Sequence, residues 1–131
     1  MNLKTIDIKG KQYVDVAERV RYFNETYPNG KITTGIIKDE DGVVIMQSIA
    51  TPDVAVSNRY FTGTAYEKEG STFINKTSYI ENCETSAVGR ALGFMGIGIE
   101  TAIASAHEVA NAVTQQAKPL FKQPKENGKN I

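Results

Sequence analysis

The apolar positions of this 131-residue chain change their spacing along the sequence, from helical to strand-like and back to helical. The first helical stretch has one apolar face, made by Val16, Val20, Phe23 and Tyr27. Asp15 is expected to cap this helix, with Glu18 completing a capping box. Pro28 should end it, because the residue before a proline avoids helical backbone angles.

Strand-like patterns surround that helix. A short strand is predicted at about residues 4–8, and β-branched or alternating segments predict three more at 31–38, 43–51 and 58–67. The acidic stretch 39–42 is expected to form a hairpin turn between the first two of these. Residues 71–76 fit either a short fourth strand or the lead-in to the next helix.

The helical spacing returns at Ser78, which forms a second predicted capping box with Glu81. Gly96 and Gly98 are expected to end this long helix. Its apolar face is made by Ile80, Cys83, Ala87, Val88, Ala91, Leu92 and Met95.

A last helix is predicted from Ser105, with Glu108 in its capping box, followed by a flexible, lysine-bearing tail over residues 118–131. The element order is therefore β-α-β-β-β-α-α. Such blocks of strands and helices predict an α+β domain over residues 1–117, in which an antiparallel sheet of three to four strands packs against the long helix.

Composition narrows the function classes. Fifteen basic residues balance fifteen acidic ones, which argues against a strongly basic nucleic-acid binder but allows a local basic groove. Cys83 is the only cysteine, so it cannot form an internal disulfide and is expected to pack in the core. The sequence shows neither a signal peptide nor a membrane-length apolar segment, so a cytoplasmic protein without membrane contact is expected.

Candidate chemistry is sparse. His107 is the only histidine and falls in the first turn of the last predicted helix, where a surface position is expected. One cysteine and one histidine cannot build a zinc site of the usual spacing, and no G-x-S-x-G nucleophile motif occurs. We therefore expect no enzyme, no catalytic residue, no metal and no cofactor.

Glycines within the long predicted helix are unusual, because each costs about 1 kcal/mol relative to alanine. With two other small residues they form a stripe at helical spacing, made by Asn82, Ser86, Gly89 and Gly93. Two interpretations remain open. The stripe packs tightly against another helix, or it admits a nucleic-acid backbone or a neighbouring subunit beside Arg90.

Other basic residues could form a groove with Arg90. The candidates for DNA binding are Arg19, Arg21, Arg59, Lys31 and Lys76, with Tyr60 as a stacking residue next to Arg59. Cations beside aromatic rings suit a groove in which phosphates bind and bases stack.

Two segments, YVDVAERVRYFNETYPNG and ENCETSAVGRALGFMGIG, carry a resemblance to the superfamily of single-strand annealing proteins. That superfamily includes phage recombination proteins and the ring-forming annealing protein of eukaryotic homologous recombination. The resemblance covers roughly residues 12–116, and its sharpest part is Gly89-Arg90-Ala91-Leu92 followed by Phe94 and Gly96. The chain looks like a small phage or mobile-element member of this group.

The resemblance implies DNA annealing without chemistry. Subunits would assemble as a homo-oligomeric ring or helical arc in the bacterial host cell and hold single-stranded DNA in a basic groove. Arg19 resembles a family arginine that contacts the DNA backbone, and Arg90 resembles the arginine of the family's long helix. Gly89 stands where the eukaryotic member usually has a lysine that contacts DNA.

Two alternatives to annealing stay open. The protein could protect single-stranded DNA without pairing it, or it could be a structural or regulatory oligomer without DNA affinity. The tail could dock a host or phage replication protein, or supply weak non-specific attraction.

Overall fold

The computed structural model describes residues 2–100 and 102–122, with the backbone alone for residues 115 and 117–122. The elements are β1 (Ile6–Ile8), β2 (Lys11–Tyr13), α1 (Val16–Thr26), β3 (Lys31–Glu40), β4 (Val43–Thr51), β5 (Phe61–Lys68), the 3-10 helix η1 (Ile74–Lys76), α2 (Tyr79–Phe94) and α3 (Ala106–Lys122). Residues 118–122 are thus helical rather than part of a tail, and the rest of the predicted tail lies outside the described residues.

The strands form two antiparallel sheets, which confirms the predicted α+β class. The main sheet has the order β3-β4-β5, and β1 and β2 form a separate hairpin. The sequence prediction missed β2, because Lys9 and Gly10 reverse the chain with positive φ angles of 51° and 85°. Residues 74–76 form η1 rather than a fourth strand. The turn between β3 and β4 is confined to Asp41 and Gly42, so strand pairing continues to Glu40.

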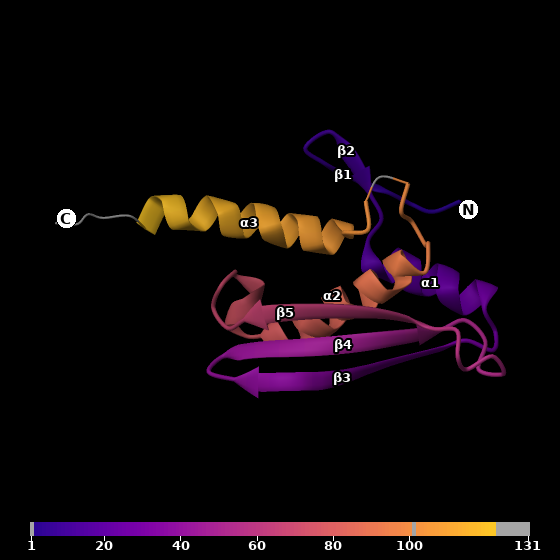
Figure 1. The fold of residues 1–131 in the computed structure, drawn as a ribbon. Helices are drawn as coiled ribbons and strands as arrows, with labels where there is room; N and C mark the ends of the chain where they lie inside the picture. Colours follow the sequence, from indigo (N-terminus) through magenta and orange to yellow (C-terminus); the bar gives the residue numbers. More distant parts are fainter. Residues whose placement is uncertain (1, 101, 123–131) are drawn as a thin grey trace.

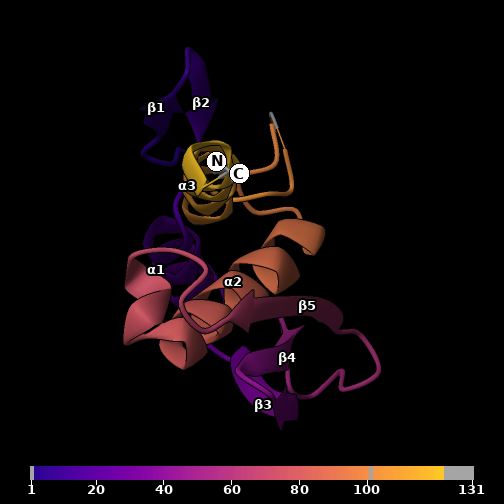
Figure 2. The same ribbon diagram turned by 90° about the vertical axis from the view of Figure 1, so that its left-hand side faces the viewer.

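The main sheet, α2 and the other helices form successive layers (Figures 1 and 2). Helix α2 lies against one face of the sheet, and α1 and α3 lie on the side of α2 away from the sheet. Among the described elements, no helix covers the opposite face of the sheet. One sheet face is therefore a core surface, while the other is open.

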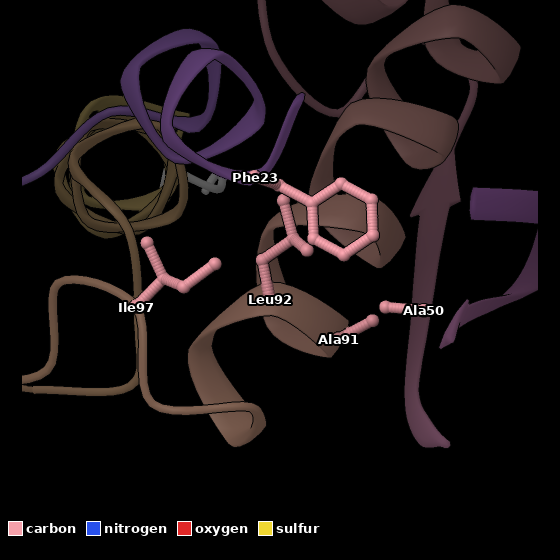
Figure 3. Close-up of a cluster of buried hydrophobic side chains, with 5 residues drawn as sticks. All are labelled: Phe23, Ala50, Ala91, Leu92 and Ile97. Carbon is pink, nitrogen blue, oxygen red and sulfur yellow. The ribbon is translucent and has the colours of Figure 1, made fainter. Parts of the chain in front are cut away.

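The core surrounds α2, between this helix and the sheet and between this helix and α1. One cluster consists of Phe23, Ala50, Ala91, Leu92 and Ile97, drawn from α1, β4, α2 and the segment after α2 (Figure 3). A second cluster consists of Val44, Met46, Cys83 and Ala87. Cys83 is fully buried, as predicted, and burial raises the pKa of its thiol to about 11. This thiol is part of the packing between α2 and the sheet.

The helix caps agree only in part with the sequence prediction. Asp15 caps α1 by accepting a hydrogen bond from the Glu18 amide at 2.9 Å. The Glu18 carboxylate does not complete the box, because it accepts from the Lys4 amide instead. Ser78 makes no side-chain capping bond at α2. At α3 the predicted box is complete, since Ser105 and Glu108 exchange bonds of 3.3 Å.

Arg19 is buried inside the chain, so its predicted contact with DNA is wrong for this conformation. Its Nη1 donates to the carbonyl oxygens of Gly89 at 2.7 Å and Ile103 at 2.9 Å. Its Nη2 donates to Gly98 at 3.1 Å, with a longer contact to Ala102 at 3.5 Å. Burial lowers the pKa of this guanidinium, while nearby carboxylates oppose that shift. Arg19 thus joins α1 to α2 and to the segment that follows α2.

The small-residue stripe of α2 is buried within the chain, so the alternative that a DNA backbone or a neighbouring subunit lies along it is wrong. All four of its residues are buried. A Cβ atom at Gly89 would lie 2.6 Å from Cγ2 of Val16. A Cβ at Gly93 would lie 2.8 Å from Nη1 of Arg19. The glycines therefore leave room for α1 and for the buried guanidinium.

Gly63 on β5 lies close against the backbone of α2. A Cβ there would lie 2.5 Å from the carbonyl oxygen of Ala87 and 2.9 Å from the carbonyl carbon of Arg90. Backbone atoms cannot rotate away as side chains can, so β5 and α2 would have to separate. A Cβ at Gly35 on β3 would meet nothing within 4 Å, so this glycine provides a matched control.

We expect Gly63→Ala to lower the free energy of unfolding by about 3 kcal/mol, the upper part of the usual range for overpacking. Gly35→Ala should change it little, because the added methyl group enters open space. Urea unfolding of both variants measures the difference. Equal stabilities would contradict the close packing of α2 on β5.

Arg19→Ala should destabilise the fold by about 3 kcal/mol, because it leaves several carbonyl groups without their charged donor. Arg21→Ala provides the control. Its side chain is 44% exposed and should matter much less to stability. An Arg19→Ala variant with the wild-type urea midpoint would overturn the structural role assigned to Arg19.

Candidate nucleic-acid interface

The open face of the main sheet presents a mixed row of polar and apolar side chains. Strand β4 alternates, so Val44, Met46, Ser48 and Ala50 face α2 and the intervening side chains face outward. Register places Thr33, Ile49 and Thr62 side by side across the three strands. On this face, the aliphatic side chain of Ile49 therefore lies between two threonine hydroxyl groups.

A shallow cavity of about 430 Å³ lies at one end of this face. We call it the sheet-face cavity, and its lining residues are Lys31, Thr33, Gln47, Ile49, Thr51, Val54, Ser57, Tyr60 and Thr62. The cavity brings together Lys31 and Tyr60, which are far apart in the sequence. Tyr60 is 53% exposed, so its ring is available to a ligand.

The loop that carries Tyr60 is held by hydrogen bonds. The Val54 amide donates to the Asn29 carbonyl at 3.0 Å, which ties this loop to the turn after α1. Within the loop, the Ala55 amide donates to the Asp53 carboxylate at 2.9 Å and the Arg59 amide to the Val56 carbonyl at 3.1 Å. These bonds hold Tyr60, the residue just before β5, at the same end of the sheet as Lys31, the first residue of β3.

The chemistry of the sheet-face cavity suits a nucleic-acid strand. The Lys31 ammonium can pair with a phosphate, and the exposed Tyr60 ring can stack on a base. The hydroxyl groups of Thr33 and Thr62 can donate to or accept from a sugar or base edge. The Arg59 guanidinium lies 4.9 Å from the centre of the Phe61 ring, next to Tyr60 in the chain. Two of the predicted DNA-binding residues, Lys31 and Tyr60, therefore line this cavity, whereas Arg59 contacts Phe61 outside it.

Two other predicted DNA-binding residues lie away from this cavity. Arg21 is on α1, where it pairs with Glu18 at 2.6 Å and Glu25 at 2.7 Å. The hydrogen bonds from Arg21 lower the pKa of the Glu18 carboxyl to about 2. Lys76 is on η1, with its ammonium 5.8 Å from the Phe73 ring centre. Neither residue lines the sheet-face cavity.

Arg90 lies at a second cavity, between β5, α2 and α3. It is 34% exposed, its Nη1 is 3.5 Å from the Glu108 carboxylate, and its guanidinium is 5.5 Å from the Phe94 ring centre. The structure therefore does not bring Arg90 together with Lys31 and Tyr60.

Several residues of the sheet face were not predicted from sequence as site residues, among them Thr33, Gln47 and Thr62. The alternation of strand 43–51 gave a signal, because it assigns Gln47 and Ile49 to one face. The alternation could not show whether this face is the one that α2 covers or the one that is open. That choice depends on where α2 packs.

None of the described helices has both the length and the apolar character needed to cross a membrane. No curated protein and no solved structure matches the chain.

A family model described as "Slr1353 N-terminal dsRNA-binding domain-like" matches residues 20–95. The matched region runs from within α1, through β3, β4 and β5, to the end of α2. It covers more than half of the chain and includes the whole sheet-face cavity. The chain therefore belongs to the Slr1353 N-terminal dsRNA-binding domain-like family.

Proposed function

We propose that this protein binds single-stranded nucleic acid across the open face of its main sheet and promotes annealing of complementary strands. The observation that carries the proposal is the sheet-face cavity, where Lys31 and the exposed Tyr60 ring lie together on an uncovered sheet. No covalent chemistry is involved.

A single strand suits this surface better than a duplex. Stacking on Tyr60 requires a base whose face is free, and the bases of a duplex are already stacked on one another. The cavity is shallow and open, so a flexible strand can follow the row of Thr33, Ile49 and Thr62. Lys31 then supplies a contact to phosphate.

Duplex RNA is the second candidate, since the family description names dsRNA binding. A duplex is recognised largely through its phosphates and 2′-hydroxyl groups, so it needs cations spaced along its backbone. The first turns of α2 expose Glu81 and Glu84, which would repel phosphates there. The charges at the start of α2 thus favour the sheet face over α2 as the binding surface.

Annealing requires several copies of the chain, and homo-oligomerisation in a ring or helical arc is part of the proposal. Each copy offers few cations at the sheet face, so the affinity of one copy is expected to be modest. Sharing one strand among many copies raises the overall affinity by avidity. A role in recombination inside a bacterial host, implied by the resemblance to annealing proteins, belongs to the same proposal.

Binding is tested by fluorescence anisotropy with a labelled single-stranded oligonucleotide. Tyr60→Ala should weaken affinity about tenfold, in the range found for loss of one base–aromatic stack. Lys31→Ala should weaken affinity several-fold and make it less dependent on salt, because one phosphate contact is lost. Phe73→Ala and Lys11→Ala are the matched controls, since both side chains are exposed and lie outside the sheet-face cavity.

The same assay run with single-stranded DNA, single-stranded RNA and duplex RNA separates the candidates. Tighter binding to duplex RNA, unaffected by Tyr60→Ala, would overturn the sheet-face proposal. An annealing assay with two complementary strands then distinguishes annealing from simple protection. Light scattering with and without oligonucleotide identifies a structural oligomer, which would assemble but not bind.

A further inference from the structure

We propose that the second cavity, between β5, α2 and α3, is a pocket for one unpaired nucleobase. This inference rests on the proposed function, because it adds a base-binding pocket to the strand-binding sheet face. The cavity has a volume of about 390 Å³, within the range usual for small-molecule pockets. Thr64, Tyr66, Ser86, Arg90, Glu108 and Asn111 are the lining residues that carry the argument.

The hydroxyl of Ser86 is the group that points most directly to a polar ligand in this cavity. Ser86 is 2% exposed and lines the cavity from α2. Its Oγ has no hydrogen-bond partner among the described residues. A buried hydroxyl without a partner is costly, so native structures usually provide one. A polar ligand in this cavity would provide it.

The charges around the cavity favour a neutral polar ligand over a free phosphate. Two cations line it, Arg90 and Lys68, together with two carboxylates, Glu67 and Glu108. Because the charges balance, a phosphate would meet as much repulsion as attraction. The Watson–Crick edge of a nucleobase offers donors and acceptors together, and this wall can pair with both.

The polar wall is fixed in position by a chain of side-chain amides. Asn75 donates to the Glu67 carboxylate at 2.8 Å, and Asn82 donates to Asn75 at 2.9 Å. Asn111 on α3 is 3.4 Å from the acceptor oxygen of Asn82. The chain links β5, η1, α2 and α3, so Glu67 and Asn111 are held in place before any ligand arrives.

The cavity is also within reach of a strand that lies on the sheet face. Thr64 on β5 lies opposite Gln47 on β4, which lines the sheet-face cavity. Tyr66, two residues further along β5, is 69% exposed and can stack on an entering base. A strand that crosses the sheet from Tyr60 therefore meets the second cavity at the edge formed by β5.

The inference is tested by NMR titration of the ¹⁵N-labelled full chain with each of the four deoxynucleoside 5′-monophosphates. At least one should shift the amide signals of Thr64, Ser86, Arg90 and Asn111. Deoxyribose 5-phosphate, which has no base, should not. If no mononucleotide shifts these signals, or if deoxyribose 5-phosphate shifts them equally, the inference is wrong.

Ser86→Ala should weaken the mononucleotide response about fivefold, the loss expected for one hydrogen bond. Its melting temperature should be no lower than that of wild type, since the removed hydroxyl has no partner in the described chain. Ser78→Ala, at the start of α2 and outside both cavities, is the matched control. An unchanged mononucleotide response in Ser86→Ala would overturn the role given to Ser86.

The two proposals fail in different ways. In one outcome, an oligonucleotide does not shift the amide signals of Thr33 and Thr62, while a mononucleotide still shifts that of Ser86. This outcome would overturn strand binding and leave the base pocket as a site for a free nucleotide. Oligonucleotide binding that shifts only the sheet-face signals would overturn the base pocket and leave strand binding standing.

Discussion

The buried guanidinium of Arg19 is the interaction on which the rest of the structure depends. It donates to carbonyl groups of α2 and of the segment after α2, so it fixes both relative to α1. A buried cation is costly, and burial lowers its pKa, so the surrounding carbonyl groups must be held in place. Gly93 makes this arrangement possible, because its lack of a side chain leaves the space that the guanidinium occupies.

That arrangement explains the glycines of α2 without any ligand. Gly89 admits Val16 of α1, Gly93 admits Arg19, and Gly63 lets β5 approach the other side of the helix. Helix α2 is therefore packed closely on two sides by neighbours that need bare backbone. The penalty of glycine in a helix, about 1 kcal/mol each, is offset by this packing. Because Gly89 and Gly93 are used for packing inside the chain, α2 offers nucleic acid no open small-residue surface, and only its Ser86 and Arg90 line the second cavity.

The open face of the sheet, rather than α2, is therefore the main candidate surface for binding nucleic acid. The family match spans α1, the main sheet and α2, and this core positions Lys31 and Tyr60 on the uncovered side. The second cavity lies at the margin of the same sheet, where α3 leaves a gap above β5. The sheet-face cavity uses outward side chains of the strands, and the second cavity adds the inward Glu67 at the edge of β5.

The sequence by itself determined the elements that depend on local chemistry. The apolar face of α1, the cap at Asp15, the capping box at Ser105, the strand alternation of β4 and the burial of Cys83 were all predicted correctly. Only the tertiary structure decided which polar groups are free to bind. In the sequence, Arg19 looks like a surface cation, because the carbonyl groups that accept its hydrogen bonds belong to Gly89 and Gly98, far along the chain. Lys31 and Tyr60 become neighbours only once the strands pair, since register and the side on which α2 packs depend on contacts across the whole chain.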